Sequence, residues 1–318
     1  MEQFQKPLIL FDTDMDTDCD DAGALGMLFE YVSAGRAHCI GIAADVPDPC
    51  PATVCEMISN WYGIHPPIGT IYEKDFPPGS SQRYQRYHDH RKTLPDEIYY
   101  NRVFARLIGK RDKDYPSAAE VYRKALASAP DGSVTVLAVG FFTAIEQLWL
   151  TPADKISELN GYDLFARKVR CVVSMGCADY PETDNYNFNY NMDRFGAKVF
   201  FDRCPCSVYV CPDGFDVITG ATFSDTFPIG HPLRTAYEIY NGPGKGRMSW
   251  DLISLLFALE PDSPLFECRT HGTIVYDDTN NHVRWNEQGS RKDYEVHSLI
   301  PSDEMAQLLE NRLHGIFD

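Results

Sequence analysis

Residues 7–29 read PLILFDTDMDTDCDDAGALGMLF and contain the features that decide the fold. An apolar run at 7–11 is followed by a charged segment and then by a second apolar run at 22–29. The pattern predicts a strand, a turn and a helix. In open α/β folds, ligands bind at the carboxyl ends of strands, which is where this charge falls. Six aspartates carry it: Asp12, Asp14, Asp16, Asp18, Asp20 and Asp21.

Such closely spaced carboxylates disfavour each other's ionisation unless a cation compensates them. Calcium is suited to this role, because it takes about six to eight oxygen ligands at roughly 2.3–2.6 Å. Helix capping could explain Asp18, Asp20 and Asp21, but it does not need six aspartates. An EF-hand loop starting at Asp12 would need Gly and Glu where the sequence has Thr17 and Gly23. The cluster therefore predicts a metal site of another kind.

Composition narrows the class of protein and of partner. The chain has 318 residues, of which 44% are hydrophobic and 24% charged, as in an ordinary globular protein with a substantial core. Its length alone fits one large domain or two smaller ones. The formal charge of −17 disfavours nucleic acid and anionic membranes as partners. A small neutral or cationic ligand is easier to accommodate.

The ten cysteines and the amino-terminal residues indicate a reducing compartment. No charged and then apolar leader precedes the first expected strand, so a cytoplasmic protein is expected. The local group Cys204, Cys206 and Cys211 lacks the spacing of a zinc site. No stretch of 18 apolar residues is present, so no membrane span is expected.

Strand and helix patterns alternate along the chain, which predicts parallel pairing with right-handed crossovers. Strands are expected at 7–11, 38–44, 68–71, 133–139, 169–175 and 207–211, and short antiparallel strands within 273–296. Helices are expected at 22–33, 51–62, 117–129, 142–150, 249–259 and 301–313, with 197–201 in another helix. Residues 72–116 form a long polar connection with some helix, of the kind that makes lids or binding loops.

Three further segments can contribute to a site. A backbone carbonyl becomes free at the turn after Val139, and Asp251 begins the apolar helix expected at 249–259. Asp251 could also be a helix cap. Residues 184–193 alternate amide and aromatic side chains, which can bind sugar hydroxyls and stack on rings, although a polar loop has the same composition.

These segments together resemble the inosine–uridine-preferring nucleoside hydrolases. Residues 10–14 (LFDTD) and 20–25 (DDAGAL) are similar to the amino-terminal D-x-D…D-D-A-x-A-L signature of that family. Residues 133–143 resemble the segment that offers a backbone carbonyl to calcium. Residues 187–197 resemble the substrate loop, and residues 249–251 (SWD) resemble the segment with the last calcium ligand. The resemblance covers nearly the whole chain.

The resemblance implies a fold and a set of residue roles. The expected fold is α/β, a single domain over 1–318, with a mostly parallel sheet flanked by helices and a small antiparallel C-terminal extension. Calcium ligands would be the side chains of Asp14, Asp21 and Asp251 and the carbonyl of Val139. Asp20 would be the general base that takes a proton from water. Substrate contacts would come from Asp45, Asn187, Asn189 and Trp250.

The sequence departs from the family pattern at several of these positions. Five residues separate Asp14 from Asp20, more than in the common form, so Asp16 competes with Asp14 for the first ligand position. Asn187 replaces a glutamate, and Asp45 an asparagine. Trp250 stands where pyrimidine-accepting members have a histidine thought to protonate the leaving base. Tryptophan can only stack, so leaving-group activation would come from elsewhere or from an intrinsically good leaving group. His88 and His90 are possible substitutes for that acid.

The favoured interpretation is a calcium-dependent hydrolase that cleaves the N-glycosidic bond of a ribonucleoside or related N-riboside to give ribose and free base. A homodimer or homotetramer is expected. One alternative is a catalytically silent ribose- or nucleoside-binding protein on the same fold. Another is a haloacid-dehalogenase-like phosphatase, because a strand followed by Asp12-Thr13-Asp14 resembles its nucleophile motif. That class also needs a later lysine and a distal acidic pair, which the sequence does not supply at a recognisable position.

Overall fold

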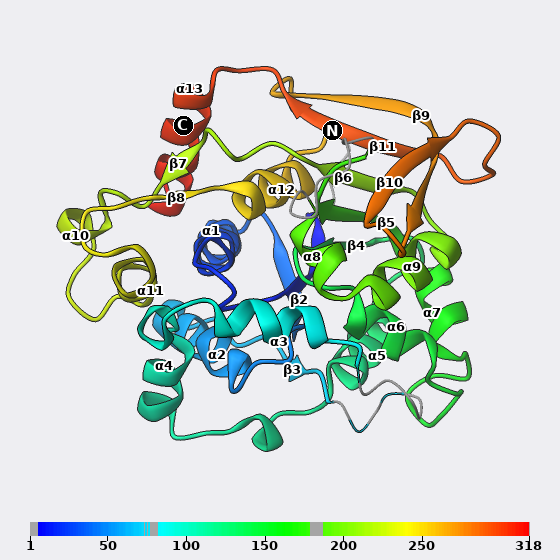
Figure 1. Cartoon of the computed structure of the whole chain (residues 1–318), viewed down its shortest axis with the longest axis horizontal. Coiled ribbons are helices and arrows are strands. Elements are labelled where there is room, and N and C mark those ends of the chain that lie inside the picture. The colour runs from blue at the N-terminus through cyan, green and yellow to red at the C-terminus, as the bar shows by residue number, and fades with distance from the viewer. Residues whose placement is uncertain (1–5, 73, 75, 77–81, 179–186, 318) are drawn as a thin grey trace.

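The computed structural model describes residues 6–72, 74, 76, 82–178 and 187–317 (Figure 1). Within these residues, nine strands form one sheet in the order β10-β9-β11-β6-β5-β4-β1-β2-β3. Its strands are β1 Leu8–Thr13, β2 His38–Ala44, β3 Ile68–Thr70, β4 Val134–Ala138, β5 Val169–Met175, β6 Val208–Cys211, β9 Phe266–Asp277, β10 His282–Asn286 and β11 Asp293–Ser298. A separate small sheet pairs β7 Ile218–Thr219 with β8 Arg247–Met248.

Pairing in the large sheet is mostly parallel, which confirms the predicted fold class. The strands from β3 to β6 are parallel to their neighbours, and β11 is parallel to β6. Only β9 runs antiparallel, to β10 on one side and to β11 on the other. The antiparallel strands thus continue the central sheet, and β9 begins seven residues before the region where short strands were expected.

Helices cover both faces of the sheet (Figure 1). They are α1 Asp20–Ser33, α2 Pro51–Tyr62, α3 Gln85–Lys92, α4 Asn101–Ile108, α5 Ala118–Ser128, α6 Thr143–Trp149, α7 Gly161–Lys168, α8 Phe188–Met192, α9 Arg194–Arg203, α10 Phe223–Thr226, α11 Pro232–Asn241, α12 Trp250–Leu259 and α13 Ser302–Leu313. Short 3-10 helices are η2 Asp96–Ile98 and η3 Asp112–Asp114. Among the described residues, no helix is long and apolar enough to span a membrane.

The core has two halves because successive strand residues point to opposite faces of the sheet. Ile9 and Phe11 of β1 pack in one half with residues of α1, α2, α11, α12 and α13. Leu10 packs in the other half with residues of α5, α6, α7 and α9. Both faces of β1 are therefore buried, as expected for a central parallel strand.

Close packing explains two glycines on α1. A Cβ added to Gly26 would lie 2.5 Å from Cδ1 of Leu233, and one added to Gly23 would lie 2.5 Å from the hydroxyl oxygen of Tyr237. Both partners are on α11, so the glycines let α11 approach the start of α1. This contact fixes the segment that carries the aspartates.

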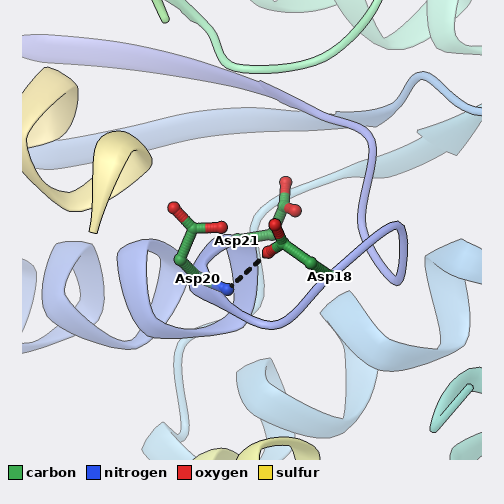
Figure 2. Close-up of side chains that lie close together, drawn as sticks. All are labelled: Asp18, Asp20 and Asp21. Atoms are coloured by element: carbon green, nitrogen blue, oxygen red, sulfur yellow. Dashed lines mark hydrogen bonds between the residues drawn. The ribbon is translucent and has the colours of Figure 1, made fainter. Parts of the chain in front are cut away.

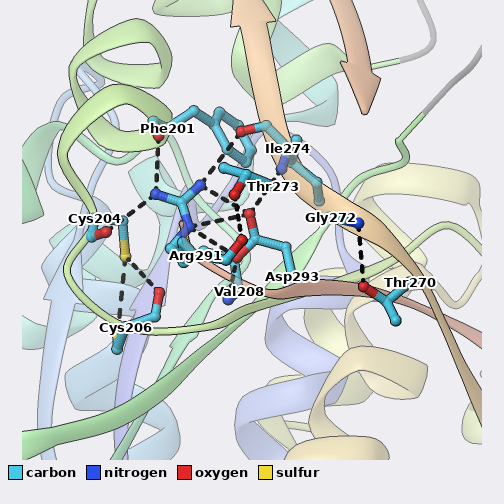
Figure 3. A network of polar contacts seen from close by, with 10 residues as sticks. All are labelled: Phe201, Cys204, Cys206, Val208, Thr270, Gly272, Thr273, Ile274, Arg291 and Asp293. Atoms are coloured by element: carbon cyan, nitrogen blue, oxygen red, sulfur yellow. Dashed lines mark hydrogen bonds and ion pairs between the residues drawn. The ribbon is translucent and has the colours of Figure 1, made fainter. Parts of the chain in front are cut away.

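A buried ion pair ties the antiparallel strands to the rest of the sheet (Figure 3). The Arg291 guanidinium donates to both carboxylate oxygens of Asp293 and to the carbonyls of Phe201 and Cys204, at the end of α9. Asp293 in turn accepts from the backbone N–H of Val208 on β6 at 3.0 Å. The start of β11 is thereby held beside β6.

Candidate active site

A cavity of about 1320 Å³ opens where strands β1, β5, β6 and β11 end. Its lining includes Asp14 after β1, residues 175–178 at the end of β5, residues 212–217 after β6, and His297 on β11. These strands are parallel to one another along the sheet, so their carboxyl ends meet at one edge. The cavity lies at the position where the sequence predicted a ligand site.

Three carboxylates gather at the first turn of α1 (Figure 2). Asp18, Asp20 and Asp21 each offer an oxygen within 4.8 Å of the others. The Asp18 carboxylate accepts from the backbone N–H of Asp20 at 3.0 Å, so it also caps the helix start. Asp21 accepts from the hydroxyl of Thr13 at the end of β1. Local structure thus turns these side chains toward one another.

Two further aspartates join this group. Asp14 and Asp251 are buried, line the same cavity and interact electrostatically with Asp21. Asp14 accepts from the Thr17 hydroxyl at 2.7 Å, and the backbone N–H of Asp251 donates to Asp20 at 3.1 Å. The carboxylate cluster is therefore Asp14, Asp18, Asp20, Asp21 and Asp251.

The cluster is short of positive charge. Burial and then repulsion from neighbouring carboxylates raise the pKa of Asp14, Asp20, Asp21 and Asp251 well above the ordinary value. Asp18 is the exception, because its ion pair with Arg247 at 2.7 Å outweighs the effect of burial and lowers its pKa. Within the described part of the chain, one guanidinium thus faces five carboxylates.

A hard cation fits this donor set. Carboxylate oxygens are the ligands that calcium prefers, and among the described residues only Asp18 of the five has an ion pair with an arginine. Asp14, Asp21 and Asp251 are the side chains that would hold it. A bound calcium would supply an acidified water and fixed positive charge at this point.

Asp16 points elsewhere. Its carboxylate accepts from the backbone N–H groups of Tyr100 at 2.8 Å and Asn101 at 3.1 Å, at the start of α4. It is absent from the cavity lining, as far as the described residues define it. Of the two competitors for the first ligand position, Asp14 is the one beside Asp21.

Asp45 also lies outside the described cavity lining. It is fully buried, accepts from the backbone N–H of Ala144 at 2.9 Å and faces Asp12. Burial raises the pKa of Asp45 to about 7, and it raises that of Asp12 as well. Asp12 is held from the other side by the hydroxyl of Tyr122 at 2.7 Å. A substrate contact of Asp45 stays a prediction.

The predicted substrate loop supports the site in two ways. Asn187 accepts from the backbone N–H of Cys177 at 2.9 Å and so fixes the turn after β5. Asn189 lines the cavity and donates to the carbonyl of Val139, the predicted backbone ligand. Both residues are buried, and Asn189 lies on α8, where a loop was expected. The part of this loop before 187 falls outside the described residues.

Trp250 lines the cavity beside the carboxylate cluster. The guanidinium of Arg247 lies 5.5 Å from the centre of its ring and 5.2 Å from that of Tyr240. Sequence reasoning assigned no role to Arg247, and the only individual role that it considered for Asp18 was helix capping. Asp18 could be noticed because it is one of the six aspartates. Its ion pair could not be predicted, because Arg247 lies 229 residues away in the sequence.

Of the two histidines predicted as substitute acids, the described cavity lining contains His90 and not His88. His271 and His297 also line the cavity and were not predicted. They lie on β9 and β11, which the parallel pairing of β11 with β6 brings to the same edge.

Comparisons with known proteins agree on the fold. No protein-family model and no curated protein matches the sequence. Solved structures match over nearly the full chain. An inosine–uridine preferring nucleoside hydrolase from Bacillus anthracis has 15% identity and a TM-score of 0.63, with 98% of this chain and 99% of that chain covered.

Two other structures are similar to the same extent. The purine-preferring ribonucleoside hydrolase from Gardnerella vaginalis has 15% identity and a TM-score of 0.61, covering 97% of this chain and 98% of that one. The type III effector protein XopQ, complexed with adenosine diphosphate ribose, has 14% identity and a TM-score of 0.70, covering 98% and 95%. The chain therefore has the nucleoside hydrolase fold, and the resemblance read from its sequence is confirmed at the level of the fold.

Proposed function

We propose that this protein is a calcium-dependent hydrolase that cleaves the N-glycosidic bond of a ribonucleoside or related N-riboside. The observation that carries the proposal is the carboxylate cluster, which lines a large cavity at the strand ends of a nucleoside hydrolase fold. Ribose and a free base are the products. Asp14, Asp21 and Asp251 would hold the calcium, together with the Val139 carbonyl, whose oxygen has a second lone pair beside the one that accepts from Asn189.

Asp20 is the general base in this proposal. It is adjacent to the ligand Asp21 and hydrogen-bonded to the backbone of Asp251, so it faces the water that attacks the sugar. Breaking the glycosidic bond builds positive charge on the sugar ring, as in other glycoside hydrolysis. Carboxylates fixed around the ring stabilise that charge.

The volume of the cavity indicates how large a substrate it can hold. Its volume of about 1320 Å³ exceeds the roughly 300–1,000 Å³ usual for small-molecule sites. A nucleoside therefore fits, and so does a riboside with a larger attached group, such as the adenosine diphosphate ribose in the effector structure. Asn189 and Trp250 line the cavity and would contact sugar and base. Asp45 and Asn187 are absent from its described lining, and their predicted substrate contacts stay predictions.

Other expectations from the sequence stay predictions: a single domain over 1–318, a homodimer or homotetramer, a cytoplasmic location and the absence of nucleic-acid and membrane partners. The fold comparisons give no support to a haloacid-dehalogenase-like phosphatase. A silent binding protein is the alternative that the decisive experiment must exclude.

That experiment measures ribose release from inosine and from p-nitrophenyl riboside by the calcium-loaded protein. Asp20→Asn keeps the size and polarity of the side chain but removes its capacity to accept the proton. We expect kcat to fall by roughly 100-fold or more while calcium and substrate still bind. Binding of inosine without ribose release by the wild type would identify a silent protein. Unchanged turnover in Asp20→Asn would assign the base to another carboxylate.

A further inference from the structure

The proposed reaction leaves the departing base without a proton donor. Trp250 stands at the place where, by the resemblance, pyrimidine-accepting nucleoside hydrolases have a histidine thought to protonate the base, and an indole ring has no acidic proton to give. Three histidines line the described cavity: His90, His271 and His297. This inference rests on the proposed function and concerns which of them acts.

His297 is held between two carboxylates. Its Nδ1 lies 3.4 Å from Asp213, and its Nε2 lies 3.2 Å from Glu295. Both carboxylates are anchored by backbone N–H groups, Asp213 by Ser298 at 2.6 Å and Glu295 by Ala178 at 3.1 Å. The imidazole therefore has a fixed orientation, and its longer contact is the one to Asp213.

The imidazole lies on the same wall as Trp250. Asp213 precedes Gly214, whose carbonyl accepts from the backbone N–H of Ser249 at 3.1 Å. A Cβ on Gly214 would lie 2.6 Å from Trp250 Cα, so the two backbones are in contact. Asp251 follows directly. The segment that holds the last predicted calcium ligand is thus joined to the carboxylate that holds His297.

The charge around His297 favours the imidazolium. Hydrogen bonds to Asp213 and then Glu295 raise its pKa to about 9. On the neighbouring strand β9, Glu267 is opposite His297 and Arg269 is opposite Glu295, and these two form an ion pair with each other. By contrast, burial and Arg91 lower the pKa of His90, which favours the neutral form.

We propose that His297 is the general acid that protonates the leaving base. The bond between C1′ and the base nitrogen breaks, and its electron pair moves onto the base. The ring nitrogen of His297 that faces Asp213 gives its proton to the base, while Glu295 keeps hold of the other ring nitrogen. The oxygen of water, which loses its proton to Asp20, forms the new bond to C1′. Asp20 then releases a proton to solvent, and His297 takes one up.

The test compares two substrates in His297→Gln. Inosine needs protonation of its leaving group, whereas p-nitrophenolate leaves without it. We expect kcat on inosine to fall by roughly 100-fold or more, and kcat on p-nitrophenyl riboside to change by less than about twofold. His271→Gln is the matched control, since it removes another histidine from the same cavity, and it should leave the ratio of the two rates unchanged. Calcium binding and the melting temperature report whether each variant folds.

The pH profile supplies a second test. For wild type, kcat on inosine should fall above about pH 9, because the imidazolium loses its proton there, and the rate on p-nitrophenyl riboside should not. Glu295→Gln keeps the oxygen that accepts from Ala178 but removes a negative charge beside His297. The fall of kcat on inosine at high pH, the alkaline limb, should therefore begin at a lower pH.

The possible failures are distinguishable. If wild type cleaves neither substrate, the proposed function is wrong, and the role of His297 with it. If wild type cleaves both substrates, two results would show that only the assignment of the acid is wrong. In one, His297→Gln loses activity equally on both substrates. In the other, it loses activity on neither. The same conclusion follows if Glu295→Gln folds and leaves the alkaline limb in place.

Discussion

At the scale of single residues, Asp14 and Asp16 separate because the backbone turns between them. Asp16 has a φ of 85°, in the left-handed region that Asp and Asn tolerate better than most residues. This turn directs the Asp16 carboxylate to the two free N–H groups at the start of α4. The segment between Asp14 and Asp20, which is longer than in the common form of the family, thus supplies the carboxylate that binds the N–H groups at the start of α4.

The different surroundings predict different losses on substitution. Asp14→Ala removes a proposed ligand, so calcium affinity should fall by at least about tenfold, as measured by calorimetric titration. Asp16→Ala should bind calcium normally but lower the free energy of unfolding by about 0.5–2 kcal/mol, the usual cost of losing a helix cap. Urea unfolding of both variants checks the second value. The reverse pattern would give the ligand position to Asp16.

Much of the site could be predicted from residues alone. Four members of the carboxylate cluster, Asp14, Asp20, Asp21 and Asp251, were singled out, because charge at a strand end and at the head of an apolar helix is unusual without a ligand. Arg247 and His297 could not be found in this way. A lone arginine or histidine has no sequence signal, and their partners Asp18 and Asp213 lie far away along the chain.

At the scale of elements, long apolar patterns were reliable and short polar helices were not. The expected ranges 38–44, 51–62 and 169–175 agree with β2, α2 and β5 at both ends. Helices α7, α10 and α11 were not expected. In α11, Leu233, Ala236, Tyr237 and Tyr240 do have helical apolar spacing after Pro232, but this pattern spans only about two turns and was not recognised. Its stability comes from packing on the glycines of α1, which sequence periodicity does not reveal.

The start of α11 gives a pH-dependent contribution to stability. The Nδ1 of His231 accepts from the backbone N–H of Leu233 at 3.2 Å, and its ring stacks 3.9 Å from that of Phe227. Burial, and then repulsion from His314, lower the pKa of His231 to about 4. Since the folded pKa is below that of the unfolded chain, the stabilisation is present above about pH 6.5 and is lost as the pH falls toward 4.

His231→Asn tests this effect, because asparagine can cap the helix but does not titrate. The free energy of unfolding of wild type, relative to the variant, should fall by about 1–3 kcal/mol between pH 7 and pH 4. Taking the difference removes the contributions of the carboxylates, which both proteins share. Denaturant unfolding at several pH values measures it. A constant difference would mean that His231 keeps its ordinary pKa in the folded state.

At the scale of the whole molecule, the carboxylate cluster joins two segments that lie far apart in the sequence. Asp14, Asp18, Asp20 and Asp21 lie between β1 and α1, whereas Asp251 begins α12, and α1 and α12 pack in the same half of the core. Repulsion across this junction opposes folding when no cation is bound. A bound calcium would turn the same junction into an attraction between distant segments.

Calcium should therefore stabilise the entire fold. At a free concentration 100 times its Kd, an ion that binds only the native state adds about 2.7 kcal/mol. We expect chelation to lower the melting temperature and calcium to restore it, as followed by calorimetry. Magnesium should restore less, because it demands a tighter octahedral site. In Asp251→Asn the calcium-dependent shift should shrink, whereas Asp262→Asn, an exposed turn residue, should keep it in full. If neither chelation nor added calcium changes the melting temperature, the cluster is stable without a metal.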